Sequence, residues 1–115
     1  MTLALSLLVL RAANPARTRR FYEALGLRFA NEQHGDGPLH CACVLGDTVL
    51  EIYPMREGAD LDRRDETRLG VRVDDLEAAL VAAVAIGATI LREPTAASPR
   101  AVLGDPDGRV VELTT

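Results

Sequence analysis

The chain contains an internal repeat. Residues of the same type or the same structural role recur 61 positions apart along the 115 residues. The matched pairs are Arg11/Arg72, Asn14/Asp75, Gly26/Gly87, Pro38/Pro99, Val49/Val110 and Glu51/Glu112. They fall at predicted helix caps, helix ends, loops and strands, where backbone conformation or chemistry restricts the choice of residue. The sequence therefore predicts two copies of one supersecondary unit within a single compact domain.

The first unit is predicted to run strand, helix, strand, strand, strand. Asn14 caps the helix, Pro15 takes its first position, and Gly26 ends it. Apolar residues at helical spacing form the buried side of this helix, since they recur every three or four residues. The expected strands cover residues 3–11, 27–30, 39–45 and 48–53.

The last two strands of this unit form a hairpin that turns at Gly46-Asp47. A two-residue turn places Leu45 opposite Thr48, Ala42 opposite Glu51, and His40 opposite Tyr53. Because side chains alternate along a strand, one face is wholly apolar and the other is mixed. The apolar face consists of Cys41, Cys43, Leu50 and Ile52. We expect the two cysteines to be buried, reduced thiols of a cytoplasmic protein.

The second unit repeats this plan after a charged linker over residues 55–67. We expect strands at 68–73, 89–93, 100–103 and 109–114, and a helix over 75–86 that Gly87 ends. The helix is apolar over more than one face. It is therefore predicted to be covered on two sides, by its sheet and by a second subunit.

Composition excludes several classes of partner. The chain has 13 basic and 17 acidic residues and only 3% aromatic residues, which argues against nucleic-acid binding. No stretch approaches the ~20 apolar residues of a membrane span. We expect a cytoplasmic protein that contacts neither nucleic acid nor membrane.

Two stretches carry a family resemblance: Phe21-Tyr22-Glu23-Ala24-Leu25-Gly26-Leu27 and Asp105-Pro106-Asp107-Gly108-Arg109-Val110-Val111-Glu112-Leu113. With the repeat, they make the chain similar to the vicinal oxygen chelate superfamily, which includes glyoxalase I, bleomycin and fosfomycin resistance proteins, and extradiol dioxygenases. The resemblance implies an α+β fold in which two βαβββ modules form a cupped, mostly antiparallel eight-stranded sheet with helices outside. Residues 1–115 would be one domain, with modules at about 3–54 and 68–115 joined by linker 55–67.

The resemblance also implies four places where metal-dependent members hold their ion. In this chain they are Leu7, Glu51, Arg68 and Glu112. Leu7 has no lone pair to donate, and Arg68 has only donors and stays protonated. We therefore predict a site without metal or other cofactor. The alternative is a metal ion bound by Glu51 and Glu112.

Strand parity and the resemblance direct seven side chains toward the central cavity: Arg11, His40, Glu51, Tyr53, Arg68, Arg72 and Glu112. Two interpretations remain open. In one, Arg68 and Arg72 neutralise the two glutamates in an internal ion-pair network. In the other, the same groups form a polar floor that orients a small ligand. His40 and Tyr53 are the candidates for acid-base chemistry.

Two classes of function follow. The first is a metal-independent protein that binds an anionic or neutral small molecule, as a homodimer, similar to the bleomycin resistance branch. The second is an enzyme. It would be a metal-dependent lyase, isomerase or dioxygenase in which His40 or water completes the coordination by Glu51 and Glu112, or a metal-independent acid-base catalyst using His40.

Overall fold

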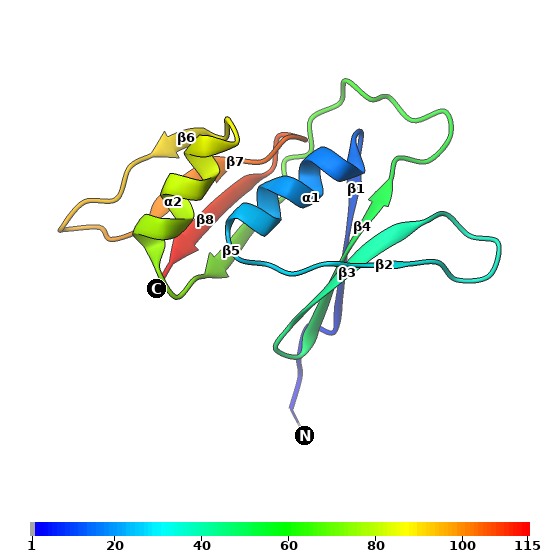
Figure 1. The fold of residues 1–115 in the computed structure, drawn as a ribbon, viewed down its shortest axis with the longest axis horizontal. Coiled ribbons are helices and arrows are strands. Elements are labelled where there is room, and N and C mark those ends of the chain that lie inside the picture. Colours follow the sequence, from blue (N-terminus) through cyan, green and yellow to red (C-terminus); the bar gives the residue numbers. More distant parts are fainter. Residues whose placement is uncertain (1) are drawn as a thin grey trace.

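A computed structural model describes residues 2–115, which contain two helices and eight strands in the predicted order (Figure 1). The first module consists of β1 (Leu7–Ala12), α1 (Pro15–Ala24), β2 (Ala30–Glu32), β3 (His40–Leu45) and β4 (Thr48–Pro54). The second consists of β5 (Arg68–Arg72), α2 (Leu76–Ala85), β6 (Thr89–Arg92), β7 (Ala101–Gly104) and β8 (Val110–Thr114). The α+β fold of two βαβββ modules is confirmed.

Each module builds its own four-stranded sheet, in the orders β1-β4-β3-β2 and β5-β8-β7-β6. In both sheets the first pair is parallel and the other two pairs are antiparallel. Within residues 2–115 no strand of one sheet pairs with a strand of the other, so the predicted single eight-stranded sheet is wrong. The reason is that the modules meet through side chains of α1 and of the turn between β7 and β8, not through a backbone ladder.

The helix ends explain why the repeat is visible in the sequence. Asn14 caps α1 by accepting a hydrogen bond from the backbone nitrogen of Arg17 at 3.1 Å. Asp75 caps α2 in the same way, accepting from Ala78 at 3.0 Å. Gly26 follows α1 with a positive φ of 108°, which favours glycine. The cap and the glycine thus fix both ends of the helix.

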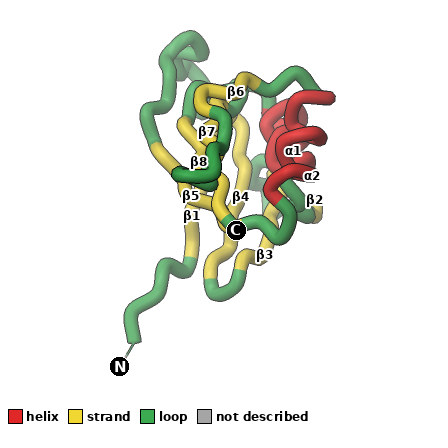
Figure 2. The backbone as a smooth tube through the Cα atoms, turned by 90° about the vertical axis from the view of Figure 1, so that its left-hand side faces the viewer, coloured by secondary structure: helices red, strands yellow, loops and turns green. Residues whose placement is uncertain are grey.

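Both helices lie on the same side of the two sheets (Figure 2). Phe21 and Tyr22 of α1 are buried in a core that includes the apolar face of the first sheet, namely Cys41, Cys43, Leu50 and Ile52. Both cysteines are free and buried, as predicted. The opposite face of each sheet carries the polar side chains and has no helix over it.

Two strands of the first module begin three or more residues later than predicted. β1 begins at Leu7, four residues later than expected, because its pairing with β4 starts at Leu7 and Val49. β2 starts only at Ala30, since Leu27 and Phe29 turn into the core before strand pairing begins. The outer side of α2, with Val81 and Val84, is uncovered in a single chain. Neither helix of residues 2–115 is long and apolar enough to cross a bilayer.

Candidate functional site

The helix-free face of the first sheet, here called the first polar face, presents a row of side chains across neighbouring strands. Strand pairing sets Glu32 beside His40, and Arg11 beside Tyr53. The rings of His40 and Tyr53 stack with centroids 4.0 Å apart and planes at 11°. The Arg11 guanidinium carbon lies 4.8 Å from the Tyr53 ring centroid, within cation–π distance. The predicted register of the hairpin is confirmed.

Glu51 occupies the adjoining row, between Ala42 of β3 and Val9 of β1. Its Oε2 atom lies 3.1 Å from Nε2 of His40. Both side chains are well buried, with 12% of Glu51 and 1% of His40 exposed. Among residues 2–115, His40 is the basic side chain whose nitrogen lies within 4.0 Å of a Glu51 oxygen, and neither predicted arginine reaches Glu51.

The helix-free face of the second sheet, the second polar face, is organised around Glu112. Arg100 donates to Oε1 of Glu112 at 2.7 Å, and Arg68 donates to Oε2 at 3.3 Å. The hydrogen bond from Arg100 and then that from Arg68 hold the pKa of the Glu112 carboxyl below its usual value. Arg72 lies on the same face, because it pairs with Thr114 two residues beyond Glu112, and it is exposed.

Arg100 is a site residue that the sequence prediction missed. The turn between β3 and β4 has two residues, whereas that between β7 and β8 has three, Pro106 to Gly108. On the strand directly before the turn, β3 or β7, equivalent residues are therefore 60 apart and not 61. Strand pairing accordingly makes Arg100 the counterpart of His40. The three-residue turn in Asp105-Pro106-Asp107-Gly108-Arg109 was the signal that could have revealed it.

The four positions at which the resemblance places metal ligands do not fit a metal ion in this chain. Leu7 is aliphatic, and both oxygens of Glu112 already accept hydrogen bonds from guanidinium groups. One of those groups, Arg68, stands at a ligand position and brings a positive charge. Of the four residues, only Glu51 has a carboxylate without an arginine beside it.

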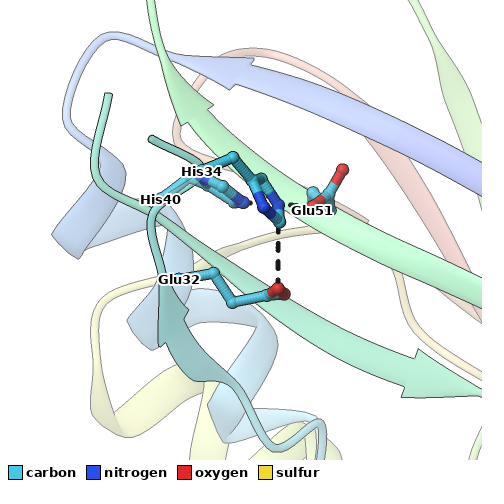
Figure 3. Close-up of side chains that lie close together, drawn as sticks. All are labelled: Glu32, His34, His40 and Glu51. Atoms are coloured by element: carbon cyan, nitrogen blue, oxygen red, sulfur yellow. Dashed lines mark ion pairs between the residues drawn. The ribbon is translucent and has the colours of Figure 1, made fainter. Parts of the chain in front are cut away.

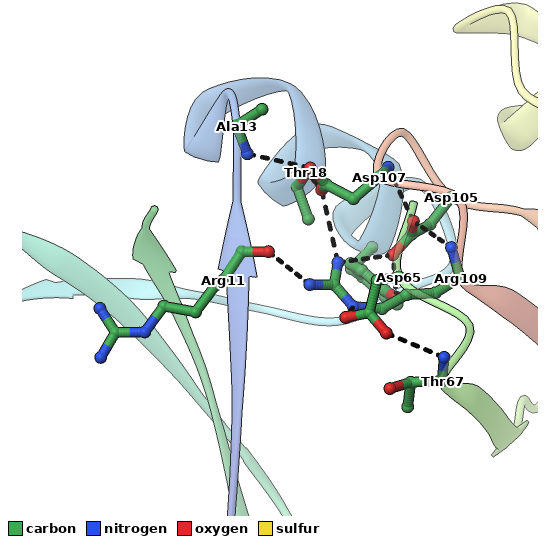
Figure 4. Close-up of polar contacts among 9 residues, drawn as sticks. Arg11, Ala13, Thr18, Asp65, Thr67, Asp105, Asp107 and Arg109 are labelled. Carbon is green, nitrogen blue, oxygen red and sulfur yellow. Dashed lines mark hydrogen bonds and ion pairs between the residues drawn. The ribbon is translucent and has the colours of Figure 1, made fainter. Parts of the chain in front are cut away.

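A buried polar cluster joins the two modules (Figure 4). At its centre Arg109, which is fully buried, donates to Asp65 at 2.8 Å, to Asp105 at 3.1 Å and to Asp107 at 3.4 Å. It also donates to the backbone carbonyl of Arg11 in β1. Burial alone would lower the pKa of Arg109, but Asp105 and Asp65 raise it, so the guanidinium stays charged. We call Arg109, Asp65, Asp105 and Asp107 the Arg109 cluster.

Helix α1 is attached to the same cluster. Tyr22 donates its hydroxyl to Asp105 at 2.7 Å, and Thr18 donates to Asp107 at 2.6 Å. Burial, followed by the charge of Asp105, raises the pKa of Tyr22. The sequence prediction assigned no such role to Asp105 or Asp107. Through Thr18, Tyr22 and the carbonyl of Arg11, the cluster therefore connects the first module to the linker and to the second module.

The comparisons with known proteins agree with this architecture. FosX, a fosfomycin resistance protein from Mesorhizobium loti, superimposes with a TM-score of 0.73 at 20% identity, over 100% of this chain and 93% of its own. TnmS3, an antibiotic binding protein from Streptomyces sp. CB03234, has a TM-score of 0.71 at 21% identity, over 98% and 95%. The oxidase ChaP-H2 has a TM-score of 0.72 at 20% identity, over 100% and 95%.

These identities show a shared fold only. No curated protein sequence matches the chain significantly. Residues 7–114, in contrast, match the model of the glyoxalase-like domain, which covers nearly all of both modules. The chain therefore belongs to the glyoxalase-like family, within the vicinal oxygen chelate superfamily.

Proposed function

We propose that the protein binds an anionic or neutral small molecule on its polar faces, without a metal ion at the four family positions. One observation carries the proposal. The second polar face presents the guanidinium groups of Arg68, Arg72 and Arg100 near the carboxylate of Glu112, and strand pairing places Arg92 in the same row. This face therefore has a positive excess that a carboxylate or phosphate group of a ligand can neutralise.

The arginines are accessible enough to take part. The side chain of Arg68 is 53% exposed although it contacts Glu112. No ion pair of Arg72 is recorded among residues 2–115. Guanidinium groups offer paired donors that match planar oxyanions, so these residues suit a ligand with a carboxylate or phosphate-like group.

The first polar face supplies a complementary surface. Arg11 and the ring of Tyr53, which is stacked on the buried ring of His40, form an aromatic and cationic platform. Such a platform suits the uncharged or aromatic part of a ligand. It is less suited to acid-base catalysis, since the His40 side chain is almost completely buried. This is why we favour binding over catalysis.

We further propose that the working form is a cytoplasmic homodimer. In one chain both polar faces lie open, and apolar residues such as Leu7, Val81 and Val84 are exposed. A second copy packed against the helix-free side of the sheets would bury Leu7 and enclose the polar faces into a cavity. FosX is a fosfomycin resistance protein and TnmS3 an antibiotic binding protein, which supports a role of this fold in binding small molecules.

The test is a thermal-shift screen with small carboxylates, phosphates and aromatic acids, followed by titration calorimetry. A ligand at 100 times its Kd should stabilise the fold by about 2.7 kcal/mol, which raises the melting temperature by several degrees. Arg72→Ala should weaken binding of the strongest anionic hit about tenfold, since it removes a charge-assisted hydrogen bond.

Arg28→Ala is the matched control, because Arg28 is exposed but lies in the segment between α1 and β2. It should leave the affinity unchanged. Equal losses in both variants would refute a role for the second polar face. Light scattering on the same sample should give twice the 12.4 kDa of one chain, and a monomer that still binds the ligand would refute the dimer.

A further inference from the structure

We propose that Glu32, His34, His40 and Glu51 form a binding site for one divalent transition-metal ion, best suited to Zn²⁺. This inference goes beyond the proposed function, which needs no metal. It also differs from the family's metal positions, because three of these four residues lie outside them. Glu51 is the one residue that the two sets share.

The four side chains converge on one point at the edge of the first polar face (Figure 3). One ligand atom from each lies within 4.8 Å of all the others. Glu32, His40 and Glu51 come from the adjacent strands β2, β3 and β4, and His34 comes from the loop after β2. Two imidazoles and two carboxylates are a ligand set of the kind that Zn²⁺ accepts.

His40 gives the strongest indication. Its Nδ1 atom lies 3.2 Å from the carbonyl oxygen of Pro38 and can donate its proton there. A hydrogen bond from the other ring nitrogen to a backbone carbonyl is the usual support of a metal-binding histidine. In this tautomer Nε2 has a free lone pair. That atom is buried and has no hydrogen-bond partner among the described residues.

The position of Glu51 fits the same interpretation. Its Oε2 atom is 3.1 Å from Nε2 of His40, yet the two atoms do not form a hydrogen bond. Ligand bonds of about 2.1 Å place neighbouring ligands of one ion about 3.0 to 3.4 Å apart. The two atoms therefore have the spacing of neighbours around a common ion.

The charges of the surrounding residues also favour a bound cation. On β1 the residues nearest Glu51 are the apolar Leu7 and Val9, so no arginine neutralises it. Glu32 contributes a second carboxylate, 3.9 Å from Nε2 of His34. When the imidazoles of His34 and His40 are neutral, no positive charge within the cluster balances the two carboxylates. A divalent cation would supply that charge.

Two of the four proposed ligands are buried, and the other two are more exposed and so have more freedom to move. His40 and Glu51 are buried, whereas the His34 side chain is 69% exposed and lies in a loop with Gly35 and Gly37. Ligand atoms of a tetrahedral ion with bonds of about 2.1 Å lie about 3.4 Å apart, so the most distant atoms of the cluster, which lie within 4.8 Å, must approach by up to about 1.4 Å. The exposed side chains can make that shift.

The experiment is titration calorimetry of untagged, chelator-treated full-length protein with ZnCl₂, without any organic ligand. Co²⁺ is added in parallel, because its visible spectrum reports coordination by nitrogen and oxygen. One Zn²⁺ per chain is expected. His34→Ala and Glu32→Gln, both at exposed side chains, should each weaken binding at least tenfold, and Glu51→Gln should do the same. Asp36→Asn, an exposed acid in the same loop, should stay within twofold of the original.

Circular dichroism establishes that each variant is folded. Zn²⁺ binding that survives both His34→Ala and Glu51→Gln would overturn the site, as would the absence of binding in the unaltered protein. Loss of Zn²⁺ through Glu112→Gln would instead assign the ion to the family positions. Arg72→Ala should leave Zn²⁺ binding intact, so failure of this site and failure of the proposed function are distinguishable.

Discussion

The two modules carry a glutamate at the same place on corresponding strands, but the surroundings of the two carboxylates differ. Glu112 is held between Arg68 and Arg100, which donate to its two oxygens. Glu51 has apolar residues on the neighbouring strand and one histidine, His40, beside it. At the same position of the fold, the carboxylate is therefore neutralised by two arginines in the second module, whereas in the first module no arginine neutralises it and a bound cation could do so.

The modules also differ at the residue that follows the hairpin turn. Thr48 in the first module donates to the carbonyl oxygen of Leu5 at 2.6 Å, within its own module. Its counterpart Arg109 is longer and donates across the boundary to the carbonyl of Arg11. At this position, Thr48 therefore stabilises the first module alone, whereas Arg109 connects the second module to the first.

The largest effect is expected when Arg109 is replaced by the residue of the first module, in Arg109→Thr. Removing this guanidinium leaves the buried carboxylates of Asp105 and Asp107 without their main partner. Loss of one partner of a buried ion pair costs about 3–5 kcal/mol, a large part of the ~5–15 kcal/mol that stabilises a domain. Urea unfolding measures this difference.

Thr48→Ala provides the control at the equivalent position. It removes one exposed hydrogen bond and should cost less than about 1.5 kcal/mol. If the two substitutions destabilise the protein equally, the Arg109 cluster does not hold the modules together.

The second effect concerns the polar faces. His40→Arg gives the first module the residue that the second has at Arg100. We expect the new guanidinium to pair with Glu51 and to weaken Zn²⁺ binding at least a hundredfold, because arginine has no lone pair to donate. Calorimetry measures the affinity, and circular dichroism checks the fold. Retention of Zn²⁺ by this variant would show that His40 is not a ligand.

The smallest effect is the dependence of stability on pH through Asp65. Burial alone would raise the pKa of this carboxyl, but hydrogen bonds from Thr67 and the charge of Arg109 lower it. Its contribution to stability is therefore complete above the unfolded pKa of about 3.9 and is lost as the pH falls through the lower folded value. The Asp65 side chain is partly exposed, so we expect less than about 1 kcal/mol.

Asp65→Asn tests this contribution. The difference in unfolding free energy between the original protein and the variant should be largest near neutral pH and should shrink below about pH 4. A difference that grows on acidification would contradict the assignment.

Much of the fold could be predicted because it depends on local rules. The caps Asn14 and Asp75, the glycines after the helices, and the alternation along β3 and β4 each depend on a few neighbouring residues. The separation of the two sheets could not be predicted in this way. It results from contacts such as that between Tyr22 and Asp105, which are 83 residues apart and follow no period.

The candidate site could likewise be predicted from the sequence only in part. Glu51, Glu112 and Arg68 follow from the repeat, and the structure places Arg68 against Glu112. Arg100 was missed because one additional residue in the second turn changes the spacing of the repeat. His34 was missed because it lies in a loop, where strand register does not specify its position. In the structure its ring centroid is 5.0 Å from that of His40.

The separation of the two sheets has a consequence for how this protein can diversify. Their strands share no backbone hydrogen bonds within residues 2–115, so a change in the angle between the sheets breaks no ladder. That angle depends on side-chain contacts: those of α1 with the Arg109 cluster, and the apolar core that both modules share. Substitutions there can alter the spacing between the polar faces, and so the size of molecule that spans them, while every residue on those faces stays the same.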